Sequence, residues 1–461
     1  MTNLAYAAGD GRFRPAAPRP LAQTPPLWRF MVGELRQNVI LGWTEEAFEA
    51  PIISRPMFGF HFHAVSDPEA VGRVLLDNVA NYPKPALLQA LAGDLLGEGL
   101  FAAEGESWKR QRRVMAPVFT PAAVKGFMPD FLGEAQMTAE AWAHQAPGVV
   151  DVAAAATATT FRVISRTLCS SDAVMSAGEA HDHVAAALAS LGDFRPGALM
   201  GAPWLDVSPR LRRAARGRAF LKDAMARFLE ERRVSDDPPD DFITRLLRAF
   251  SQDYAPDEAA RLTLQNALTF LVAGHETTAN ALAWTLYILS EQQQVQDVLA
   301  AEARDALTET DPDAIIEWLP YLRWVLDETL RLYPPAPRLE RQAAADDELC
   351  GHRVRKGDLV SVWPWLVHRH RRLWDDPDVF DPENFSPEAR AAHHRFQYIP
   401  FGAGPRVCIG AQFATAEALL ILATWLARYR FSPVPGHRVE VQADIALRPK
   451  GGLPLKVQAR A

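Results

Sequence analysis

The chain has 461 residues, 48% of them hydrophobic, and a formal net charge of −7. This length and apolar content are sufficient for a large folded body with a sizeable core. The acidic balance, without a long basic run interleaved with aromatic residues, argues against nucleic-acid binding.

The N-terminal segment and the cysteine content indicate the cellular setting. Residues 1–26 are rich in Ala and Pro and lack the basic start and compact apolar stretch of a secretory signal. We expect a flexible, loosely held segment there, followed by one folded domain over residues 27–461. No stretch reaches the roughly twenty uninterrupted apolar residues of a transmembrane helix. The three cysteines, Cys169, Cys350 and Cys408, do not suggest a disulfide framework, so we expect a soluble cytoplasmic protein.

Hydrophobic periodicity predicts a mainly α fold with a minor β-sheet portion. Residues 58–65 are typical of a strand, residues 66–69 cap a helix that runs to about residue 78, and residues 82–104 are expected to form a loop. The chain shows no internal repeat, and residues 236–239 indicate a loop within the domain. Further helices are expected at residues 129–145, 152–168, 179–191, 209–233, 242–250 and 412–429, and further strands at residues 438–443 and 455–457.

A basic segment, W-K-R-Q-R-R, occupies residues 108–113. Trp108 and Arg112 lie four residues apart, so on a helix they share a face and can bracket a carboxylate. Lys109, Arg110 and Arg113 point elsewhere and are suited to steer an acidic protein partner. An ordinary solvated basic patch explains these three cations equally well.

A long helical pattern over residues 257–289 contains A-G-H-E-T-T from Ala273 to Thr278. Apolar residues cover broad faces of this pattern, which predicts a central helix. Gly and Thr weaken or bend a helix, and such local conflicts are expected at functional sites. A carboxylic acid beside a hydroxyl can relay protons, so Glu276 and Thr277 are the candidate catalytic pair. Taken alone, the same residues are compatible with an ion-paired carboxylate and a packing residue.

Glu328 and Arg331 are spaced three residues apart on a predicted helix that ends at Pro334. This spacing places both side chains on one helix face. An isolated pair of this kind contributes only a few tenths of a kcal/mol, so the motif means little without its context.

The most informative segment is F-G-A-G-P-R-V-C-I-G, from Phe401 to Gly410. Glycines at positions 402, 404 and 410 allow a tight turn that directs backbone amides at the sulfur of Cys408. The cysteine precedes a long apolar helix, whose positive N-terminus favours a thiolate, the form that binds a metal. A buried structural cysteine beside a glycine turn is the alternative for a shorter motif.

With this segment intact, the chain resembles the cytochrome P450 family of haem-thiolate monooxygenases, whose signature is F-G-x-G-x-R-x-C-x-G. The family motifs W-x-x-x-R, A-G-x-E-T-T and E-x-x-R occur in the family's order. The resemblance covers most of the chain and is strongest after Arg261. It implies the P450 fold, a helix-rich haem domain with a minor sheet, of the soluble bacterial type.

The resemblance also assigns roles to residues. It implies haem b with an axial thiolate from Cys408, within the loop that Phe401 and Gly410 delimit. Proton delivery falls to Glu276 and Thr277, and Ala273 leaves room above the haem. The expected contacts to the haem propionates are Trp108, Arg112, Arg341 and Arg406.

The family's E-x-x-R pair, here Glu328 and Arg331, locks the segment beneath the haem loop together with a further arginine. In this chain Asn384 stands where that arginine is usual. An amide can donate a hydrogen bond, but it cannot supply the charged bidentate fork of arginine. We therefore do not expect a complete charged network of three residues.

The implied reaction inserts one oxygen atom from O2 into an apolar small molecule, by hydroxylation or epoxidation. The chain has no flavin or iron–sulfur motif, so electrons are expected from a ferredoxin or flavodoxin with its reductase. A peroxide-driven peroxygenase of the same fold and a non-catalytic haem sensor or carrier are the alternatives. Fatty acids, terpenoids and steroids are all compatible substrates, and the candidate pocket residues are Leu95, Leu96, Phe101, Met200, Trp204, Phe270 and Leu339.

Overall fold

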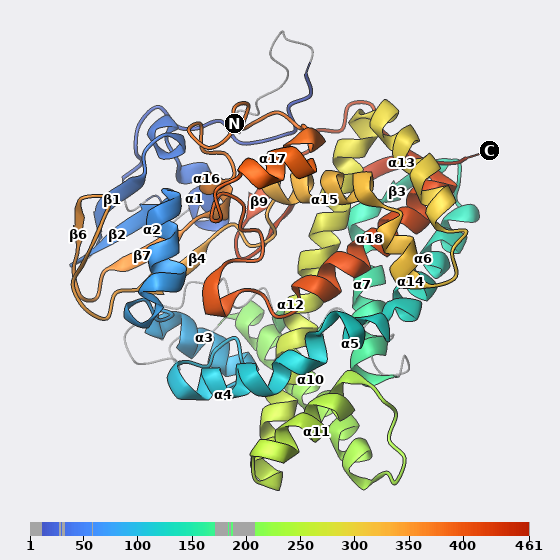
Figure 1. Cartoon of the computed structure of the whole chain (residues 1–461), viewed down its shortest axis with the longest axis horizontal. Helices are drawn as coiled ribbons and strands as arrows, with labels where there is room; N and C mark the ends of the chain where they lie inside the picture. Colours follow the sequence, from blue (N-terminus) through green and yellow to red (C-terminus); the bar gives the residue numbers. More distant parts are fainter. Residues whose placement is uncertain are drawn as a thin grey trace. The chain divides into compact units, whose positions relative to one another are not determined.

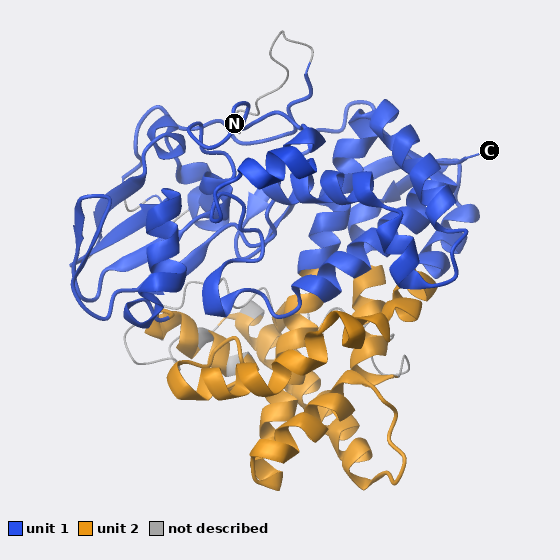
Figure 2. Ribbon diagram, viewed as in Figure 1, with its two compact units in different colours: residues 1–83, 135–157, 277–461 blue, residues 84–134, 158–276 orange. Residues whose placement is uncertain are grey.

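The computed structural model describes residues 12–26, 29, 33–57, 59–170, 183, 186–187 and 208–460. Helices predominate and the strands form small sheets, as the sequence predicts (Figure 1). The chain divides into two compact units (Figure 2). Unit 1 comprises residues 1–83, 135–157 and 277–461, and unit 2 comprises residues 84–134 and 158–276. The expected single domain over residues 27–461 stays a prediction.

Among the residues that the structure describes, no helix combines the length and the apolar character needed to cross a membrane.

Unit 1 contains a four-stranded sheet in the order β1-β2-β7-β4. Strands β2 and β7 pair in parallel and the other neighbours pair antiparallel. The expected strand at residues 58–65 is β2. The bounds are β1 Ile52–Met57, β2 Phe60–Val65, β4 Leu339–Gln342 and β7 Leu359–Val362.

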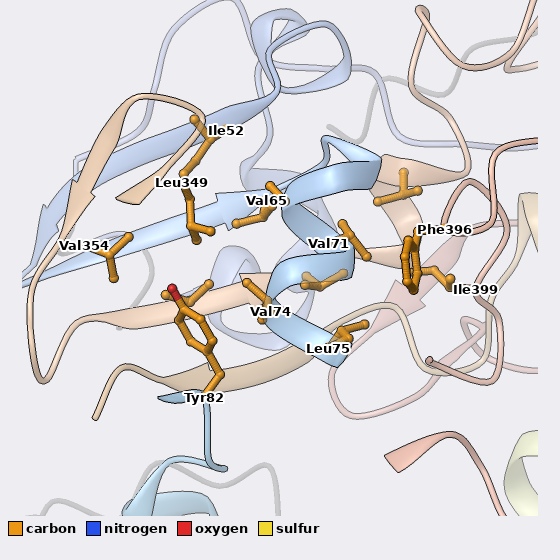
Figure 3. Close-up of a cluster of buried hydrophobic side chains, with 14 of the residues drawn as sticks. Ile52, Val65, Val71, Val74, Leu75, Tyr82, Leu349, Val354, Phe396 and Ile399 are labelled. Atoms are coloured by element: carbon orange, nitrogen blue, oxygen red, sulfur yellow. The ribbon is translucent and has the colours of Figure 1, made fainter. Parts of the chain in front are cut away.

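One face of this sheet builds the core shown in Figure 3. The short helix α2 (Pro68–Gly72) and the π-helical turn η4 (Arg73–Asp77) pack their apolar residues against it. Asp67 caps α2 by accepting a hydrogen bond from the Ala70 amide, at 2.9 Å. Phe396 and Ile399, which precede the cysteine loop, belong to the same buried cluster. The core therefore anchors the segment that leads into that loop.

Helix α18 (Ala411–Arg428) is buried along most of its length, and α13, α14, α15 and β8 pack against it. This helix and the strands near the C-terminus agree with the predicted elements to within a few residues. The other helices are α13 Gln293–Ala306, α14 Pro312–Glu317, α15 Pro320–Leu332, α16 Pro364–Val367 and α17 Pro387–Ala392. The other strands are β3 Gly148–Asp151, β5 Asp347–Leu349, β6 His352–Val354, β8 Tyr429–Pro433, β9 Val441–Ala443, β10 Leu447–Pro449 and β11 Pro454–Ala459.

Within the described residues 12–26, the N-terminal segment forms hydrogen bonds to later parts of unit 1. The Ala16 amide donates a hydrogen bond to the Tyr287 hydroxyl at 3.1 Å, and the Tyr333 hydroxyl donates to the Ala16 carbonyl at 2.6 Å. The Phe380 amide donates to the Phe13 carbonyl at 3.0 Å. These three hydrogen bonds connect residues 13 and 16 to later parts of unit 1.

Unit 2 is helical. It contains α3 Ala86–Leu96, α4 Gly105–Met115, α5 Pro121–Lys125, α10 Pro209–Val234 and α11 Phe242–Asp253. Three further helices contribute residues to both units: α6 Met128–Ala143, α7 Val152–Cys169 and α12 Pro256–Glu291.

The expected loop at residues 82–104 is wrong in part, because α3 occupies its centre. Prolines and glycines at both ends of A-L-L-Q-A-L-A-G-D-L-L suggest a loop, but its Ala and Leu content favours a helix. The expected helix at residues 179–191 lies almost wholly outside the described residues. The other predicted helices agree with the observed bounds to within a few residues.

Candidate functional site

The cysteine loop is a closed turn in front of α18. The Cys408 amide donates to the Phe401 carbonyl at 2.9 Å, and the Val407 amide donates to the Gly404 carbonyl at 3.1 Å. A 3-10 turn, η9 (Gly404–Arg406), lies between these bonds, and Gly410 is the N-cap of α18. Cys408 is exposed and is not part of a disulfide. The loop thus presents one sulfur just before the positive end of an 18-residue helix.

Two positions of the loop require glycine. Gly402 and Gly404 have φ angles of +72° and +67°, in the left-handed region that L side chains rarely adopt. A Cβ atom on Gly404 would lie 1.9 Å from the carbonyl oxygen of Leu75 in η4. Gly410 also lies in a turn, but its φ of −88° is open to other residues, so this turn does not require glycine.

Strand β4 passes beside the loop. A Cβ on Gly402 would contact the Leu339 side chain at 3.6 Å. Side chains alternate along a strand, so Arg341 shares this face with Leu339, whereas Arg338 and Glu340 share the other. The Arg338 guanidinium lies 3.6 Å from the Glu340 carboxylate on that other face. Arg341 is therefore better placed than Arg338 to reach a group held by the cysteine loop.

The donor set around Cys408 suits a metal with one protein ligand. Among the described residues, no group of three or more His, Cys, Asp or Glu side chains is arranged to hold a metal ion. Buried His368 accepts a hydrogen bond from the Ile399 amide at 2.8 Å, and burial lowers the pKa of its imidazole to about 3. His368 therefore supports the backbone before the loop as a neutral side chain. A single thiolate with arginines nearby fits haem, whose porphyrin supplies the equatorial ligands and whose propionates are anionic.

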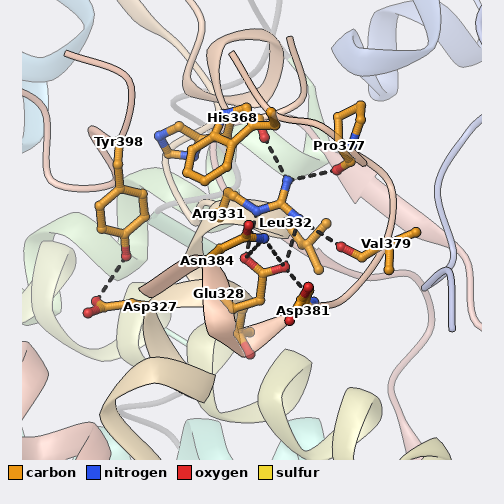
Figure 4. Close-up of polar contacts among 12 residues, drawn as sticks. Asp327, Glu328, Arg331, Leu332, His368, Pro377, Val379, Asp381, Asn384 and Tyr398 are labelled. Carbon is orange, nitrogen blue, oxygen red and sulfur yellow. Dashed lines mark hydrogen bonds and ion pairs between the residues drawn. The ribbon is translucent and has the colours of Figure 1, made fainter. Parts of the chain in front are cut away.

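Glu328 and Arg331 on α15 form a buried ion pair (Figure 4). The Nε and Nη2 atoms of Arg331 lie 2.6 and 2.7 Å from the two carboxylate oxygens, and both side chains are fully buried. Arg331 also donates to the carbonyls of His368, Pro377 and Val379, at 2.9, 2.7 and 2.8 Å. The pair thereby fixes two irregular segments against α15.

Asn384 takes a weaker part in this network. Its amide nitrogen lies 3.4 and 3.5 Å from the two oxygens of Glu328, which is long for a hydrogen bond. The Asp381 amide provides a shorter contact to the same carboxylate, at 2.8 Å. A backbone amide therefore supplies one of the hydrogen bonds that a third arginine would donate to Glu328.

A second polar network, which sequence reasoning missed, centres on Asp327. This carboxylate accepts hydrogen bonds from Arg323 at 3.0 Å, Arg390 at 2.9 Å and the Tyr398 hydroxyl at 3.0 Å. It connects α15 to α17 and to the segment before the cysteine loop (Figure 4 shows the Tyr398 contact). In the sequence, the spacing of four residues between Arg323 and Asp327 was an indication of this network.

The A-G-H-E-T-T segment lies within α12. Between residues 271 and 290 the side chains are buried except at Ala273, Gly274, Glu276 and Thr277. Spacings of three and four residues place Ala273, Glu276 and Thr277 on one helix face. An acid and a hydroxyl thus occur together on the accessible face of this otherwise buried part of α12, residues 271–290.

Trp108 and Arg112 are both half-buried on α4. The three outward cations each have a partner in unit 2. Lys109 lies 2.6 Å from Glu106, Arg113 lies 3.7 Å from Asp253, and Arg110 stacks 3.8 Å above the Tyr254 ring. The two ion pairs partly offset the positive charge with which the segment would attract a protein partner, whereas the neutral Tyr254 ring leaves the charge of Arg110 in place.

The candidate residues are distributed over both units (Figure 2). Unit 1 holds Leu339, Arg341, Glu328, Arg331, Phe401, Arg406, Cys408, Gly410 and Thr277, and unit 2 holds Leu96, Phe101, Trp108, Arg112, Phe270, Ala273 and Glu276.

Comparison with known proteins decides the family. The family model "Cytochrome P450" matches residues 43–455. Cyclooctatin synthase of Streptomyces melanosporofaciens is 31% identical over 386 residues, which cover 82% of this chain and 83% of that protein. The chain belongs to the cytochrome P450 family.

Further relatives agree. Cyclooctat-9-en-7-ol 5-monooxygenase of the same organism is 32% identical over 373 residues, covering 80% of each chain. The crystal structure of the cytochrome P450DA heme domain matches with a TM-score of 0.82 at 24% identity, covering 96% of this chain and 98% of that one. Another cytochrome P450 crystal structure gives a TM-score of 0.77 at 27% identity, covering 90% and 93%. The predicted fold and family are confirmed, and this cytochrome P450 is an oxidoreductase of the haem monooxygenase class.

The pocket residues predicted for this P450 have mixed surroundings. Phe270 packs 4.9 Å from Phe119 and 4.8 Å from Phe242, between ring centroids, so an aromatic cluster already explains its apolar character. Leu96 is buried, whereas 45% of Phe101 is exposed. The Leu95 side chain, Met200 and Trp204 lie outside the described part of the structure.

One buried acid of the P450 escaped sequence analysis. Glu417 lies on α18 and is 2% exposed. Burial raises the pKa of its carboxyl well above the usual range, and the nearby Thr278 hydroxyl on α12 offsets this only in part. Burial thus favours the protonated, neutral form of this carboxyl. A lone Glu within the apolar run Ala411–Arg428 was the visible signal.

Proposed function

We propose that this P450 binds haem b through the thiolate of Cys408 and hydroxylates or epoxidises an apolar small molecule. The observation that carries the proposal is the closed loop, with left-handed Gly402 and Gly404, that presents an exposed thiol before α18. When bound, haem supplies the oxygen-activating chemistry of the family.

The loop residues hold and tune the sulfur. The positive N-terminus of α18 favours the thiolate over the thiol. The hydrogen bond from the Cys408 amide to the Phe401 carbonyl fixes the direction of the cysteine backbone. Because Gly404 lies directly against Leu75, the loop cannot shift toward η4.

Four side chains are proposed to bind the propionates. Arg341 and Arg406 belong to unit 1, and Trp108 and Arg112 belong to unit 2. Buried carboxylates need charged or hydrogen-bonding partners, and guanidinium and indole groups supply both.

Glu276 and Thr277 are proposed to deliver protons. Both are accessible on α12 beside the small residues Ala273 and Gly274. A carboxylic acid next to a hydroxyl can pass a proton from solvent toward a bound oxygen molecule.

The substrate is proposed to be a hydrophobic alkenol or a molecule of similar character. This choice is supported by the name of one relative, cyclooctat-9-en-7-ol 5-monooxygenase, at 32% identity. The screen that tests it titrates purified protein with cyclic alkenols, fatty acids and steroids and records the Soret shift. A response to fatty acids alone would exclude the alkenol proposal.

A separate ferredoxin or flavodoxin, with its reductase, is proposed to supply electrons. Because the cations on α4 already have partners, we expect only a weak salt dependence from them. The cytoplasm is the expected location, in keeping with three cysteines that are not part of a disulfide.

The decisive test of the thiolate is the spectrum of the reduced protein under carbon monoxide. The wild type should show the red-shifted Soret band of a thiolate complex, and Cys408→His should lose it. Cys350→Ser changes the other exposed cysteine and should retain the band. A red-shifted band in Cys408→His would disprove the assignment.

The peroxide-driven alternative is tested at the proposed relay. If O2 is the oxidant, Glu276→Gln and Thr277→Ala should each slow O2-dependent turnover and increase peroxide release. Rapid turnover with hydrogen peroxide that is unaffected by both substitutions would favour a peroxygenase. Absence of substrate-dependent electron consumption with every reductant tried would favour a sensor or carrier.

A further inference from the structure

A hydroxyl on α7 contacts the backbone of α12 directly before the proposed proton-relay residue. Within unit 2, the Thr160 hydroxyl donates to the carbonyl of His275 at 2.8 Å. Both residues are buried, at 0% and 3% exposure. His275 immediately precedes Glu276, so this bond acts on the backbone from which the Glu276 side chain departs.

A second side-chain donor acts one turn earlier in α12. The Nδ1 atom of His275 lies 2.8 Å from the Leu271 carbonyl oxygen. A carbonyl only accepts hydrogen bonds, so the proton is on Nδ1. The carbonyls of Leu271 and His275, four residues apart, therefore each accept a side-chain donor. Such donors compete with the helical N–H groups and turn the carbonyls outward, which bends a helix locally.

Close packing keeps α7 at this turn. A Cβ atom on Gly274 would lie 3.1 Å from the terminal methyl of Ile164 on α7, so a larger residue would push that side chain away. The Phe161 ring meets the His275 ring edge-on, with centroids 5.6 Å apart. Thr160, Phe161 and Ile164 thus form a set of α7 contacts to Gly274 and His275.

We propose that Thr160 is a positioning residue for proton delivery: its hydroxyl fixes the His275 carbonyl and thereby the direction of Glu276. The proposal rests on the proposed role of Glu276. Thr160 is buried on α7 and acts through the α12 backbone. Because a small misplacement of a proton donor slows transfer strongly, one lost hydrogen bond should be measurable in the reaction.

The chain offers a matched set of variants. Thr160→Val removes the donor and keeps the β-branched shape, and Thr160→Ser keeps the donor. Thr167→Val is the control, because Thr167 lies on the same helix, is 2% exposed, and donates within that helix, to the Val163 carbonyl at 2.9 Å and the Ile164 carbonyl at 3.3 Å. Thr160→Ala is the second donor-less variant if the valine protein does not fold.

The kinetic readout needs neither the natural substrate nor the natural reductant. Haem-loaded protein is reduced with dithionite and mixed with oxygenated buffer, and the Soret band reports its reoxidation in H2O and D2O between pH 6 and 9. We expect Thr160→Val to change the rate by about three- to tenfold and to alter the solvent isotope effect. Thr160→Ser and Thr167→Val should match the wild type.

A second readout does not depend on the reaction. Hydrogen exchange followed by mass spectrometry should show faster exchange over residues 271–280 in Thr160→Val than in Thr160→Ser. Equal acceleration in Thr167→Val would show a general packing effect and overturn the proposal.

Glu276→Gln separates this proposal from the proposed function. If Glu276→Gln changes reoxidation and Thr160→Val does not, the positioning role is wrong. If Glu276→Gln also leaves reoxidation unchanged, the proton-delivery role of Glu276 is wrong, and the inference falls with it.

Discussion

Arg331 and Glu328 face each other in a bidentate ion pair from which solvent is fully excluded, with N–O distances of 2.6 and 2.7 Å. Three backbone carbonyls occupy the remaining donors of the guanidinium. Removal of the partner of such a deeply buried charge strongly destabilises the folded protein.

Glu328→Gln should therefore lower the free energy of unfolding by about 3–5 kcal/mol, because it strands the buried Arg331 cation. Arg323→Gln is the control, since it removes a half-exposed arginine while buried Asp327 keeps its contacts to Arg390 and Tyr398, and it should cost less than about 1 kcal/mol. Urea unfolding of the two variants measures the contrast. Equal losses would mean that the fully buried pair contributes no more than the half-exposed one.

Asn384→Ala should cost less than about 1 kcal/mol, because its contacts to Glu328 are 3.4 and 3.5 Å long. A double-mutant cycle with Glu328→Gln isolates the coupling between the two side chains. A coupling energy above about 1.5 kcal/mol, the upper range of a neutral hydrogen bond, would show that Asn384 replaces the family's arginine in full.

The local parts of this arrangement were predictable from the sequence. The cysteine loop is one contiguous segment, and Glu328 and Arg331 are three residues apart, so chain geometry alone brings their side chains together. The long helix α12 was predicted because apolar residues cover several of its faces.

The nonlocal parts were not predictable. The carbonyls that accept from Arg331 are 37 to 48 residues away in sequence, and Thr160 is 115 residues from His275. No spacing rule reaches that far, because the fold rather than the local chain determines these contacts. Helix α3 was missed for a local reason. The Gly and Pro residues at both ends of the segment suggested a loop, although its Ala and Leu content favours a helix.

Substitution by alanine should destabilise the folded protein to different extents at the two left-handed glycines of the cysteine loop. Gly404→Ala should cost at least about 3 kcal/mol, because it combines a left-handed φ with a Cβ only 1.9 Å from the Leu75 oxygen. Gly402→Ala meets its nearest atom at 3.6 Å and should cost about 1–2 kcal/mol from the backbone alone. Thermal unfolding compares them, and equal losses would show that the contact with η4 is not tight.

Glu417 gives stability a specific pH dependence. The folded protein holds its proton to a pH well above the usual 4.5, whereas the unfolded chain releases it near that value. Above pH 4.5 ionisation of Glu417 in the unfolded chain stabilises that state, so the contribution of Glu417 to the free energy of unfolding declines as pH rises. Glu417→Gln lacks this proton, and the titrations of all other groups cancel in the comparison.

The stability of Glu417→Gln relative to wild type should thus increase with pH, by up to about 1.4 kcal/mol per unit, from pH 4.5 until Glu417 ionises in the fold. Urea unfolding of both proteins between pH 5 and 8 measures this slope. Infrared spectra at pH 7 provide an independent check, because the wild type should show a carbonyl band of a protonated carboxylic acid that Glu417→Gln lacks. A difference in stability that does not vary with pH would mean that Glu417 is ionised inside the folded protein, and a charged partner would then have to accompany it between α18 and Thr278.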